Sequence, residues 1–533
     1  MRSIVIVVVA LCLSLQVSEA HKLAPNTFDN LTIETEYGPV TGFLETVSTF
    51  QARAFYGIPY AAPPVGNLRW TDPQPPAQWN TPLMANHFGP GCPQFCNLPN
   101  YTCPTSFDED CLYLNVWAPV TISEPAPVMF WIHGGHYEQG SGAGPLYEGV
   151  VLASKGAVIV TINYRLAALG FLWFDSAPGN FGIKDQLFAL QWVQKNIAAF
   201  GGDPNRVTLF GQSAGGTSVS VLLTAPSVVN AVPPLYHSAI VHSNPIGLPM
   251  MTPEAGKELT LRLQALVNCS STETDIACMR NVGMLPLIVA QAEAAAHVDI
   301  KHILDVFYPW APALGDFLPD EPLTLFQNGK GAVVPTVWGT VEEEGRIFVY
   351  EAVSSALNTL EYDAFIAVSF GITHLGTIAS AYPSQSGDNR DIACAMITDR
   401  LFTCPQRAAM RGQAKLNTTF QYRFNHSFDN SGIWQMLSMC EGHVCHAIEL
   451  PYVFNDLHAN VIPVSPREVD LADRISTAWA NFAITSNPQV ANWAPFDANN
   501  DNTYVWDVDN QSGAITGLRG SFCDMWDKVG YQF

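Results

Sequence analysis

The sequence predicts an α/β fold with a mainly parallel central sheet that helices cover on both faces. Short apolar, β-prone runs alternate along the chain with stretches of helical periodicity, and this alternation is typical of parallel sheets packed between helices. The chain has 533 residues, of which 48% are hydrophobic and 14% are charged. No segment combines low hydrophobicity with high charge, so the chain can bury a large core.

The expected elements follow one another without an intervening linker. A β-rich entry covers Leu31–Tyr60, and the proline- and glycine-rich stretch Pro63–Pro104 is expected to form loops. Buried strands are expected at Val128–His133, Ala157–Tyr164, Arg206–Phe210, His237–His242, Val334–Gly339 and Phe420–Asn425. Helices are expected at Asn180–Phe200, after Ser213, and at Arg467–Ile484. Because no repeat or Pro/Ser-rich tract divides the chain, residues 21–533 are expected to form one domain.

Residues 1–20 are predicted to be a secretory signal peptide. Arg2 supplies a positive charge, Ile4–Leu15 is apolar, and Ser18-Glu19-Ala20 offers a small-residue cleavage site. The apolar run is shorter than the roughly 20 residues of a membrane-spanning helix, and an uncleaved anchor is the alternative. Since no later segment resembles a span, the mature protein is expected to be secreted and extracellular.

Six N-x-[ST] sequons agree with an exported glycoprotein. Their asparagines are Asn30, Asn100, Asn268, Asn417, Asn425 and Asn510. Chance produces several sequons in a chain of this length, so each gains its weight from the signal peptide.

The formal net charge of −22 and the lack of a Lys/Arg cluster argue against nucleic acid as a partner. The acidity has two interpretations, which are solubility outside the cell and steering of cationic substrates. The sequence shows neither G-K-[ST] nor a G-x-G-x-x-G register near Gly134, so no nucleotide cofactor is expected. No other cofactor and no metal ion is expected either. The oligomeric state is open, with a homodimer as one candidate.

Ser213 is the predicted nucleophile. It is the centre of a G-x-S-x-G sequence at Gly211–Gly215, a pattern that is weak by itself. Its context is informative, because a strand precedes it and a helix-compatible run, Gly216–Leu223, follows it. A strand-to-helix elbow of this kind exposes a strained serine, and small neighbours let other backbone approach. The alternative is a glycine-rich turn with an idle serine.

A second glycine-rich segment follows the strand Val128–His133 and is predicted to stabilise an oxyanion. The backbone N–H groups of Gly134, Gly135 and His136 would point at the developing charge, joined by the N–H of Ala214. A hydroxyl nucleophile also needs a base that a third group orients.

These motifs, with Glu109–Asn115 and Asn180–Gln186, resemble the carboxylesterase type B family of α/β-hydrolases, which includes the cholinesterases. The resemblance runs from about Tyr37 to Trp526 and so covers nearly all of the mature chain. It implies an α/β-hydrolase fold and hydrolysis of a small-molecule carboxylic ester through an acyl-enzyme at Ser213.

The resemblance also implies the acid and the base, which in α/β-hydrolases follow the serine in the order Asp/Glu, then His. The spacing from the preceding strand matches the family's acid motif and selects Glu344 over Glu342 and Glu343, in what would otherwise be a solvated turn. The family's H-x-x-E pattern selects His446 over its neighbour His443.

His136 stands where the family usually has a third consecutive glycine. Its backbone N–H is kept, so the oxyanion site need not be lost. One interpretation is that the side chain only narrows the acyl side of the pocket. The other is that a second imidazole helps water to attack the acyl-enzyme or a phosphoryl-serine.

Disulfides follow from the resemblance for Cys92 with Cys111, Cys269 with Cys278, and Cys404 with Cys523. Cys96 with Cys103, and Cys440 with Cys445, are local guesses that leave Cys394 unpaired. Sequence alone does not establish the connectivity. In the family, the loop Cys92–Cys111 forms one wall of the active-site gorge.

The predicted pocket differs from that of cholinesterases at three positions. Tyr101 replaces a tryptophan that stacks on the quaternary ammonium, Gln212 replaces a glutamate, and the aromatic pair after the acid is Ile347 and Phe348. Neutral esters are therefore the expected substrates, with choline esters or one lipophilic hormone or lipid ester as alternatives. A non-catalytic, neuroligin-like adhesion protein is a further alternative, although such proteins have lost the serine that is present here.

Overall fold

The computed structural model describes residues 31–269, 276–296, 309–459 and 462–531. The predicted signal peptide at residues 1–20 and the sequon asparagine Asn30 lie outside these ranges. Within them, every helix is too short or too polar to cross a membrane.

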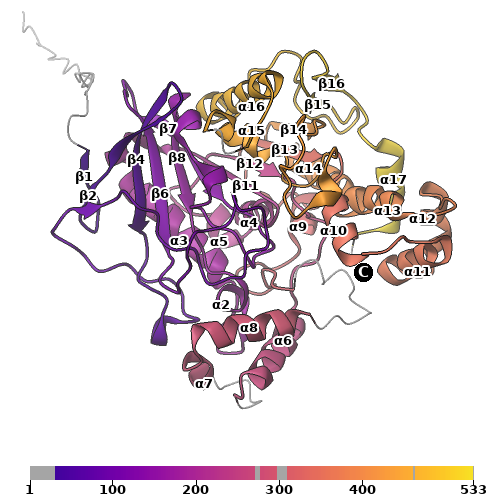
Figure 1. The fold of residues 1–533 in the computed structure, drawn as a ribbon, viewed down its shortest axis with the longest axis horizontal. Coiled ribbons are helices and arrows are strands. Elements are labelled where there is room, and N and C mark those ends of the chain that lie inside the picture. Colours follow the sequence, from indigo (N-terminus) through magenta and orange to yellow (C-terminus); the bar gives the residue numbers. More distant parts are fainter. Residues whose placement is uncertain (1–30, 270–275, 297–308, 460–461, 532–533) are drawn as a thin grey trace, which may run out of the picture.

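An eleven-stranded sheet runs through the described part of the chain (Figure 1). In spatial order its strands are β16 (Gly513–Ile515), β15 (Thr503–Trp506), β14 (Thr419–Phe424), β13 (Thr336–Val341), β12 (Ser238–His242), β11 (Gly202–Gln212), β7 (Ala126–Ile132), β8 (Val158–Ile162), β6 (Tyr113–Pro119), β4 (Phe50–Pro59) and β3 (Phe43–Val47). Neighbouring strands from β15 to β8 are parallel, and only the two flanks are antiparallel. The predicted α/β class with a mainly parallel sheet is confirmed.

Helices cover both faces of this sheet. Along β7, Val128 and Phe130 belong to one hydrophobic core and Met129 and Trp131 to the other, because successive side chains of a strand point to opposite faces. The first core lies under α3 (Phe181–Asn196) and α4 (Ala214–Leu222), and the second under α1 (Val150–Ser154), α15 (Leu450–Phe454) and α16 (Pro466–Thr485). Both faces are buried, which explains why the central strands are continuously apolar.

The remaining elements lie outside this central layer. The small strands are β1 (Thr32–Glu34), β2 (Pro39–Thr41), β5 (Leu83–Met84), β9 (Trp173–Phe174) and β10 (Ala177–Pro178). The other helices are α2 (Ala167–Phe171), α5 (Pro226–Val229), α6 (Pro253–Leu266), α7 (Ile276–Arg280), α8 (Met284–Ala295), α9 (Pro322–Gln327), α10 (Gly345–Ala352), α11 (Thr359–Phe370), α12 (Leu375–Ala381), α13 (Arg390–Ile397), π-helical η5 (Thr398–Thr403), α14 (Cys404–Gln413) and α17 (Gly520–Val529). In Figure 1, α6–α8 project on one side of the molecule and α11–α12 on another.

The predicted strands correspond to β7, β8, β11, β12, β13 and β14, with ends shifted by a few residues. The largest shift is at β11, which begins at Gly202 instead of Arg206. The helix expected at Arg467–Ile484 is α16, which begins with a capping box between Ser465 and Glu468 and with a proline in its first turn. The strand β6 was not predicted; its first three residues stand within a motif that was interpreted only by its resemblance.

Candidate active site

Ser213 lies in the sharp turn between β11 and α4. Its backbone has φ 58° and ψ −124°, a conformation that a residue with a side chain rarely adopts. The turn depends on small neighbours, since a Cβ at Gly215 would come within 2.0 Å of the carbonyl oxygen of Ile132. The elbow therefore places the serine directly before the N-terminus of α4, where the helix dipole favours negative charge.

His446 and Glu344 are brought together from loops that follow neighbouring strands. Glu344 follows β13 and His446 lies in the long loop after β14. Nδ1–H of His446 donates to Oε2 of Glu344 at 2.5 Å, and Oε1 of Glu344 accepts from the backbone N–H of Val341 at 2.8 Å. Glu344 is fully buried and His446 is 7% exposed. The imidazole is thus held in one orientation by a desolvated carboxylate.

The neighbouring acid and histidine make a separate pair. Nδ1 of His443 lies 3.0 Å from Glu343, whose carboxylate also accepts from the N–H of Val444 at 2.9 Å. The third carboxylate of the run, Glu342, lies 3.2 Å from Arg423. Of the three adjacent glutamates, Glu344 is the one that contacts His446.

Gln212 contacts the other ring nitrogen of His446. Its Nε2 lies 3.1 Å from Nε2 of His446. Because Nδ1 of His446 carries the proton that is donated to Glu344, Nε2 has a free electron pair and the amide N–H donates to it. This amide occupies the position at Nε2 that a hydroxyl nucleophile would need.

A second buried carboxyl, Glu449, lies close enough to Glu344 for their charges to interact. It accepts from the hydroxyl of Ser243 at 3.2 Å. Burial and the charge of Glu344 raise the pKa of Glu449 to about 8. Glu449 is therefore largely protonated at neutral pH and adds no second negative charge beside Glu344.

The segment Gly134–His136 packs against the serine elbow. A Cβ at Gly134 would lie 2.6 Å from the carbonyl oxygen of Gln212 and 3.0 Å from Cβ of Ser213, so this close approach requires glycine. His136 has φ 57°, the left-handed region that glycine adopts most easily and that histidine enters more often than most residues. Burial, with a smaller effect of His446, lowers the pKa of His136 to about 4, so its imidazole is neutral at neutral pH.

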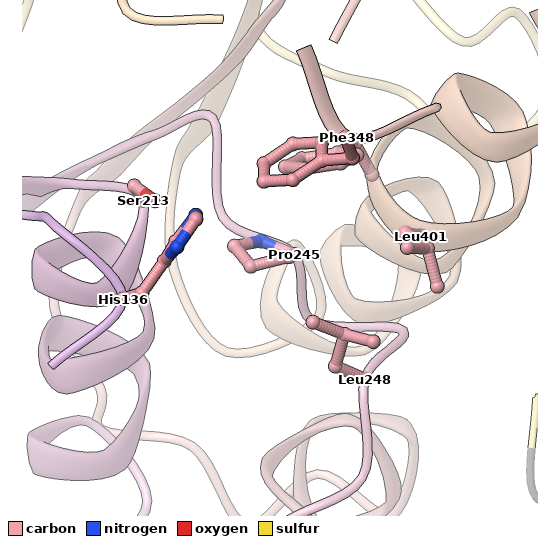
Figure 2. Close-up of a pocket in the computed structure, with 7 residues that line it drawn as sticks. His136, Ser213, Pro245, Leu248, Phe348 and Leu401 are labelled. Carbon is pink, nitrogen blue, oxygen red and sulfur yellow. The ribbon is translucent and has the colours of Figure 1, made fainter. Parts of the chain in front are cut away.

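Two cavities meet at Ser213. The smaller, of about 10 Å³, is shown in Figure 2, and its walls are His136, Ser213, Pro245, Leu248, Phe348, Leu401 and Phe402. The larger cavity has a volume of about 240 Å³, and His446 and Gln212 line it. Its apolar walls include Tyr101, Tyr147, Phe428, Trp434 and Leu437.

Each predicted pocket residue lines the larger cavity: Tyr101, Gln212 and Phe348, the last of which also lines the smaller one. Phe428 and Trp434 were not predicted, although aromatic residues in the loop before His446 were a usable signal. Four residues of the smaller cavity had no local pattern that could predict them, because they meet only in the folded chain: Pro245, Leu248, Leu401 and Phe402.

The structure has disulfides at each of the predicted pairs: Cys92–Cys111, Cys96–Cys103, Cys269–Cys278, Cys404–Cys523 and Cys440–Cys445. Cys394 is buried and not in a disulfide. The first two bonds hold the loop that supplies Tyr101 to the larger cavity, and the last closes the loop immediately before His446.

Among the residues that the structure describes, one group of side chains has the geometry of a metal site, namely His426, Asp429 and Glu468. Its oxygens already have protein partners. Arg467 donates to Asp429 at 2.7 Å, and the hydroxyl of Tyr452 donates to Glu468 at 3.1 Å. We interpret this group as an ion-pair network at the start of α16.

The chain matches the model of the carboxylesterase family over residues 29–526. It is 33% identical to the crystal protein of Dictyostelium discoideum, over 92% of this chain and 90% of the relative. It is 34% identical to the para-nitrobenzyl esterase of Bacillus subtilis, over 89% of this chain and 94% of the relative. A solved structure of a PNB esterase superimposes with a TM-score of 0.79 at 32% identity, covering 93% of this chain and 99% of that one.

Proposed function

This chain belongs to the carboxylesterase family and is a carboxylic ester hydrolase, and we propose that it cleaves neutral esters through an acyl-enzyme at Ser213. The observation that carries the proposal is the contact of 2.5 Å between His446 and Glu344 beside the serine elbow. An oriented imidazole that lines the same cavity as a strained serine at the N-terminus of a helix supports nucleophilic acyl transfer.

In the proposed mechanism, Nε2 of His446 accepts the proton of Ser213 as the hydroxyl attacks the ester carbonyl. Glu344 keeps the imidazole in the correct tautomer and stabilises the imidazolium that forms. The N–H groups of Gly134, Gly135, His136 and Ala214 stabilise the oxyanion. His446 then gives the proton to the leaving alcohol, and water repeats the sequence on the acyl-enzyme.

In this mechanism each of the two cavities holds one part of the ester. The leaving oxygen must lie near His446, because His446 protonates it. His446 lines the larger cavity and is absent from the walls of the smaller one. The alcohol part therefore occupies the larger cavity, and the acyl part enters the smaller one. A volume of about 10 Å³ holds about one water-sized group, so the favoured acyl group is close to acetyl in size.

A panel of p-nitrophenyl esters of rising acyl length tests this proposal, run beside acetylthiocholine and butyrylthiocholine. We expect kcat/KM to be highest for the acetate and to fall by about tenfold or more by the butyrate, since misfitting methylene groups cost on the order of 1–3 kcal/mol each in such pockets. A rise with acyl length would contradict the division of the ester and favour the lipid-esterase alternative.

Hydrolysis of choline esters is the second candidate function, because Trp434 and Glu351 also line the larger cavity. An indole face and a carboxylate are groups that bind quaternary ammonium ions. Two residues argue against this candidate. Gln212, beside the proposed nucleophile, is uncharged, and Tyr101 replaces the tryptophan of cholinesterases in the loop that Cys92–Cys111 closes. Dominant turnover of thiocholine esters over neutral esters would establish it.

His136 forms a wall of the smaller cavity, with its ring centroid 5.5 Å from that of Phe348. We therefore expect His136→Gly to raise the relative kcat/KM for the butyrate, and to leave unchanged the rate at which enzyme treated with an organophosphate recovers activity. A slower recovery in the variant would instead assign the imidazole to activation of water.

Secretion and glycosylation remain part of the proposal. Asn100, Asn268 and Asn510 are exposed, and Asn417 and Asn425 are half-buried. Expression of the full chain in eukaryotic cells tests both properties, with ester hydrolase activity in the medium and a mass decrease after glycosidase treatment as the expected results. Light scattering of the purified protein decides between a monomer and the homodimer.

A further inference from the structure

The walls of the smaller cavity come from chain segments far apart in sequence. Pro245 and Leu248 lie in the loop after β12, and Leu401 and Phe402 lie in η5. The backbone N–H of Gly247 donates to the carbonyl oxygen of Leu401 at 3.0 Å and joins the two walls. They are in direct contact, since a Cβ at Gly247 would lie 2.6 Å from the carbonyl oxygen of Arg400.

One buried side chain, Arg400, ties both walls to the C-terminal segment. Its Nη1 donates to the carbonyl oxygen of Gly247 at 3.0 Å, and its Nη2 donates to that of Tyr531 at 2.9 Å. The guanidinium carbon also lies 5.4 Å from the ring centroid of Tyr531 and 5.8 Å from that of Trp526. Arg400 is 1% exposed, so water cannot readily replace these partners if the side chain is lost.

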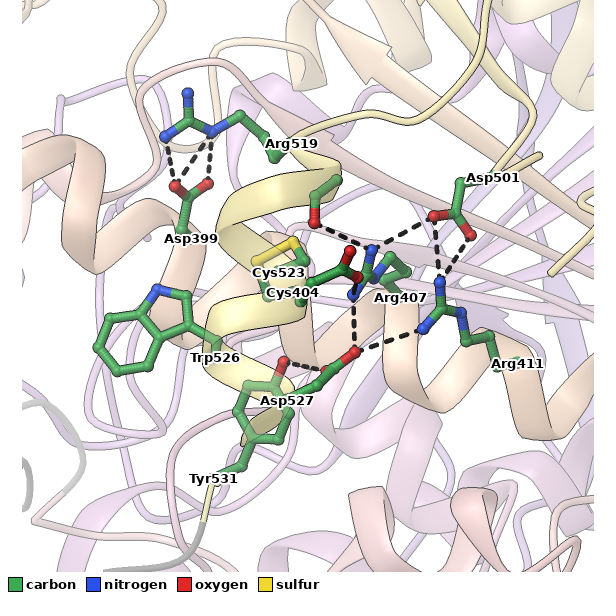
Figure 3. The surroundings of a disulfide bond; sticks show 12 residues. Asp399, Cys404, Arg407, Arg411, Asp501, Arg519, Cys523, Trp526, Asp527 and Tyr531 are labelled. Carbon is green, nitrogen blue, oxygen red and sulfur yellow. Dashed lines mark hydrogen bonds and ion pairs between the residues drawn. A yellow bond between two sulfur atoms is a disulfide. The ribbon is translucent and has the colours of Figure 1, made fainter. Parts of the chain in front are cut away.

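The C-terminal helix α17 is itself fastened to η5 and α14 on both sides of the cavity wall (Figure 3). Before Leu401, Asp399 accepts from Arg519 at 2.9 Å. After Phe402, the disulfide Cys404–Cys523 links the two helices. Leu401 and Phe402 therefore lie between two attachments to α17 and its N-cap residue.

We propose that Arg400 and α17 set the size of the acyl group that the enzyme accepts. Arg400 acts as a positioning residue, because it touches the walls and leaves Ser213, His446 and Glu344 untouched. This inference rests on the proposed function, in which the acyl group enters the smaller cavity. In a space of about 10 Å³, a small outward movement of Leu401 or Leu248 is enough to admit additional methylene groups.

The test is the ratio of kcat/KM for p-nitrophenyl butyrate to that for the acetate in Arg400→Met. Methionine keeps the apolar stem and removes both hydrogen bonds, and we expect the ratio to rise about tenfold. The absolute rates are a poorer measure, because Phe402 also packs against the ring of His446, with centroids 5.3 Å apart. Arg400→Lys, which keeps the charge and loses the two-pronged geometry, should give an intermediate ratio.

Arg407→Met is the matched control. Arg407 is similarly buried and also binds α17, donating to Asp524 at 2.8 Å and to Asp527 at 2.6 Å. Unlike Arg400, it donates to no residue of the loop that carries Pro245 and Leu248. We expect this variant to lose stability without a change in the ratio. An unchanged ratio in folded Arg400→Met, or an equal change in Arg407→Met, would overturn the inference.

A second variant keeps the inference testable if Arg400→Met fails to fold. Gly247→Ala places a methyl group against the carbonyl oxygen of Arg400 and should separate the same two walls, so the ratio should rise; an unchanged ratio would again overturn the inference. Failure of the proposed function is distinguishable in the wild-type protein, which would then hydrolyse neither ester or would prefer the butyrate to the acetate.

Discussion

Ser213→Ala is expected to lower kcat for p-nitrophenyl acetate by about 10⁶-fold, to the residual rate that binding and the oxyanion site supply. The reason is that alanine has no atom to carry the acyl group. The measurement is the initial rate at saturating substrate. Labelling by a fluorophosphonate probe should be lost in the same variant, which separates a catalytic serine from the idle serine of a non-catalytic adhesion protein.

Ser220→Ala is the control for this variant. Ser220 lies on the same helix α4, is fully buried, and accepts from the side-chain amide of Asn244 at 2.7 Å. Its removal disturbs the packing of α4 without touching the elbow, so turnover should stay within a few-fold of wild type. If Ser213→Ala kept more than about one-hundredth of the wild-type turnover, the acyl-enzyme mechanism would be wrong.

Glu344→Gln is expected to lower kcat by about 10⁴-fold, although the amide has nearly the same shape as the carboxylate. The backbone N–H of Val341 donates to Oε1 and will select the amide oxygen for that position. The amide nitrogen must then face Nδ1 of His446, where the carboxylate now accepts at 2.5 Å. His446 is forced to place its proton on Nε2, and that nitrogen can no longer accept the proton of Ser213.

Glu343→Gln provides the comparison, since it changes the adjacent carboxylate with the same chemistry. Glu343 contacts His443 and Arg346 instead of His446. We expect its kcat to remain within a few-fold of wild type, and the unfolding midpoints of both variants should be measured to exclude a loss of folded protein. Similar losses in the two variants would mean that the acid has been assigned to the wrong glutamate.

Much of the fold could be predicted because the signals are local. The strands β7, β8 and β11–β14 are short apolar runs bounded by loops, and α16 has a capping residue, a proline in its first turn and one apolar face. The helices α6 to α14 could not be predicted in the same way. They pack on the outside of the central layer, where their positions depend on partners that are distant in sequence.

The parts of the active site that are encoded locally could likewise be predicted from the sequence. The sequence by itself determined the elbow at Ser213, because a strand, small flanking residues and a helix are all contained in about twenty consecutive residues. It also made Glu344 and His446 the expected partners, through their spacing from predicted strands and their resemblance to family motifs.

Only the tertiary structure decided how these groups meet. Glu344 and His446 are 102 residues apart, and Gln212 and His446 are 234 residues apart, so their contacts depend on the order of strands in the sheet. The same holds for the two cavities at Ser213, whose unequal volumes arise where η5, the loop after β12 and the loop before His446 converge. A cavity is a property of packed volumes and long-range hydrogen bonds, and no short stretch of residues encodes it.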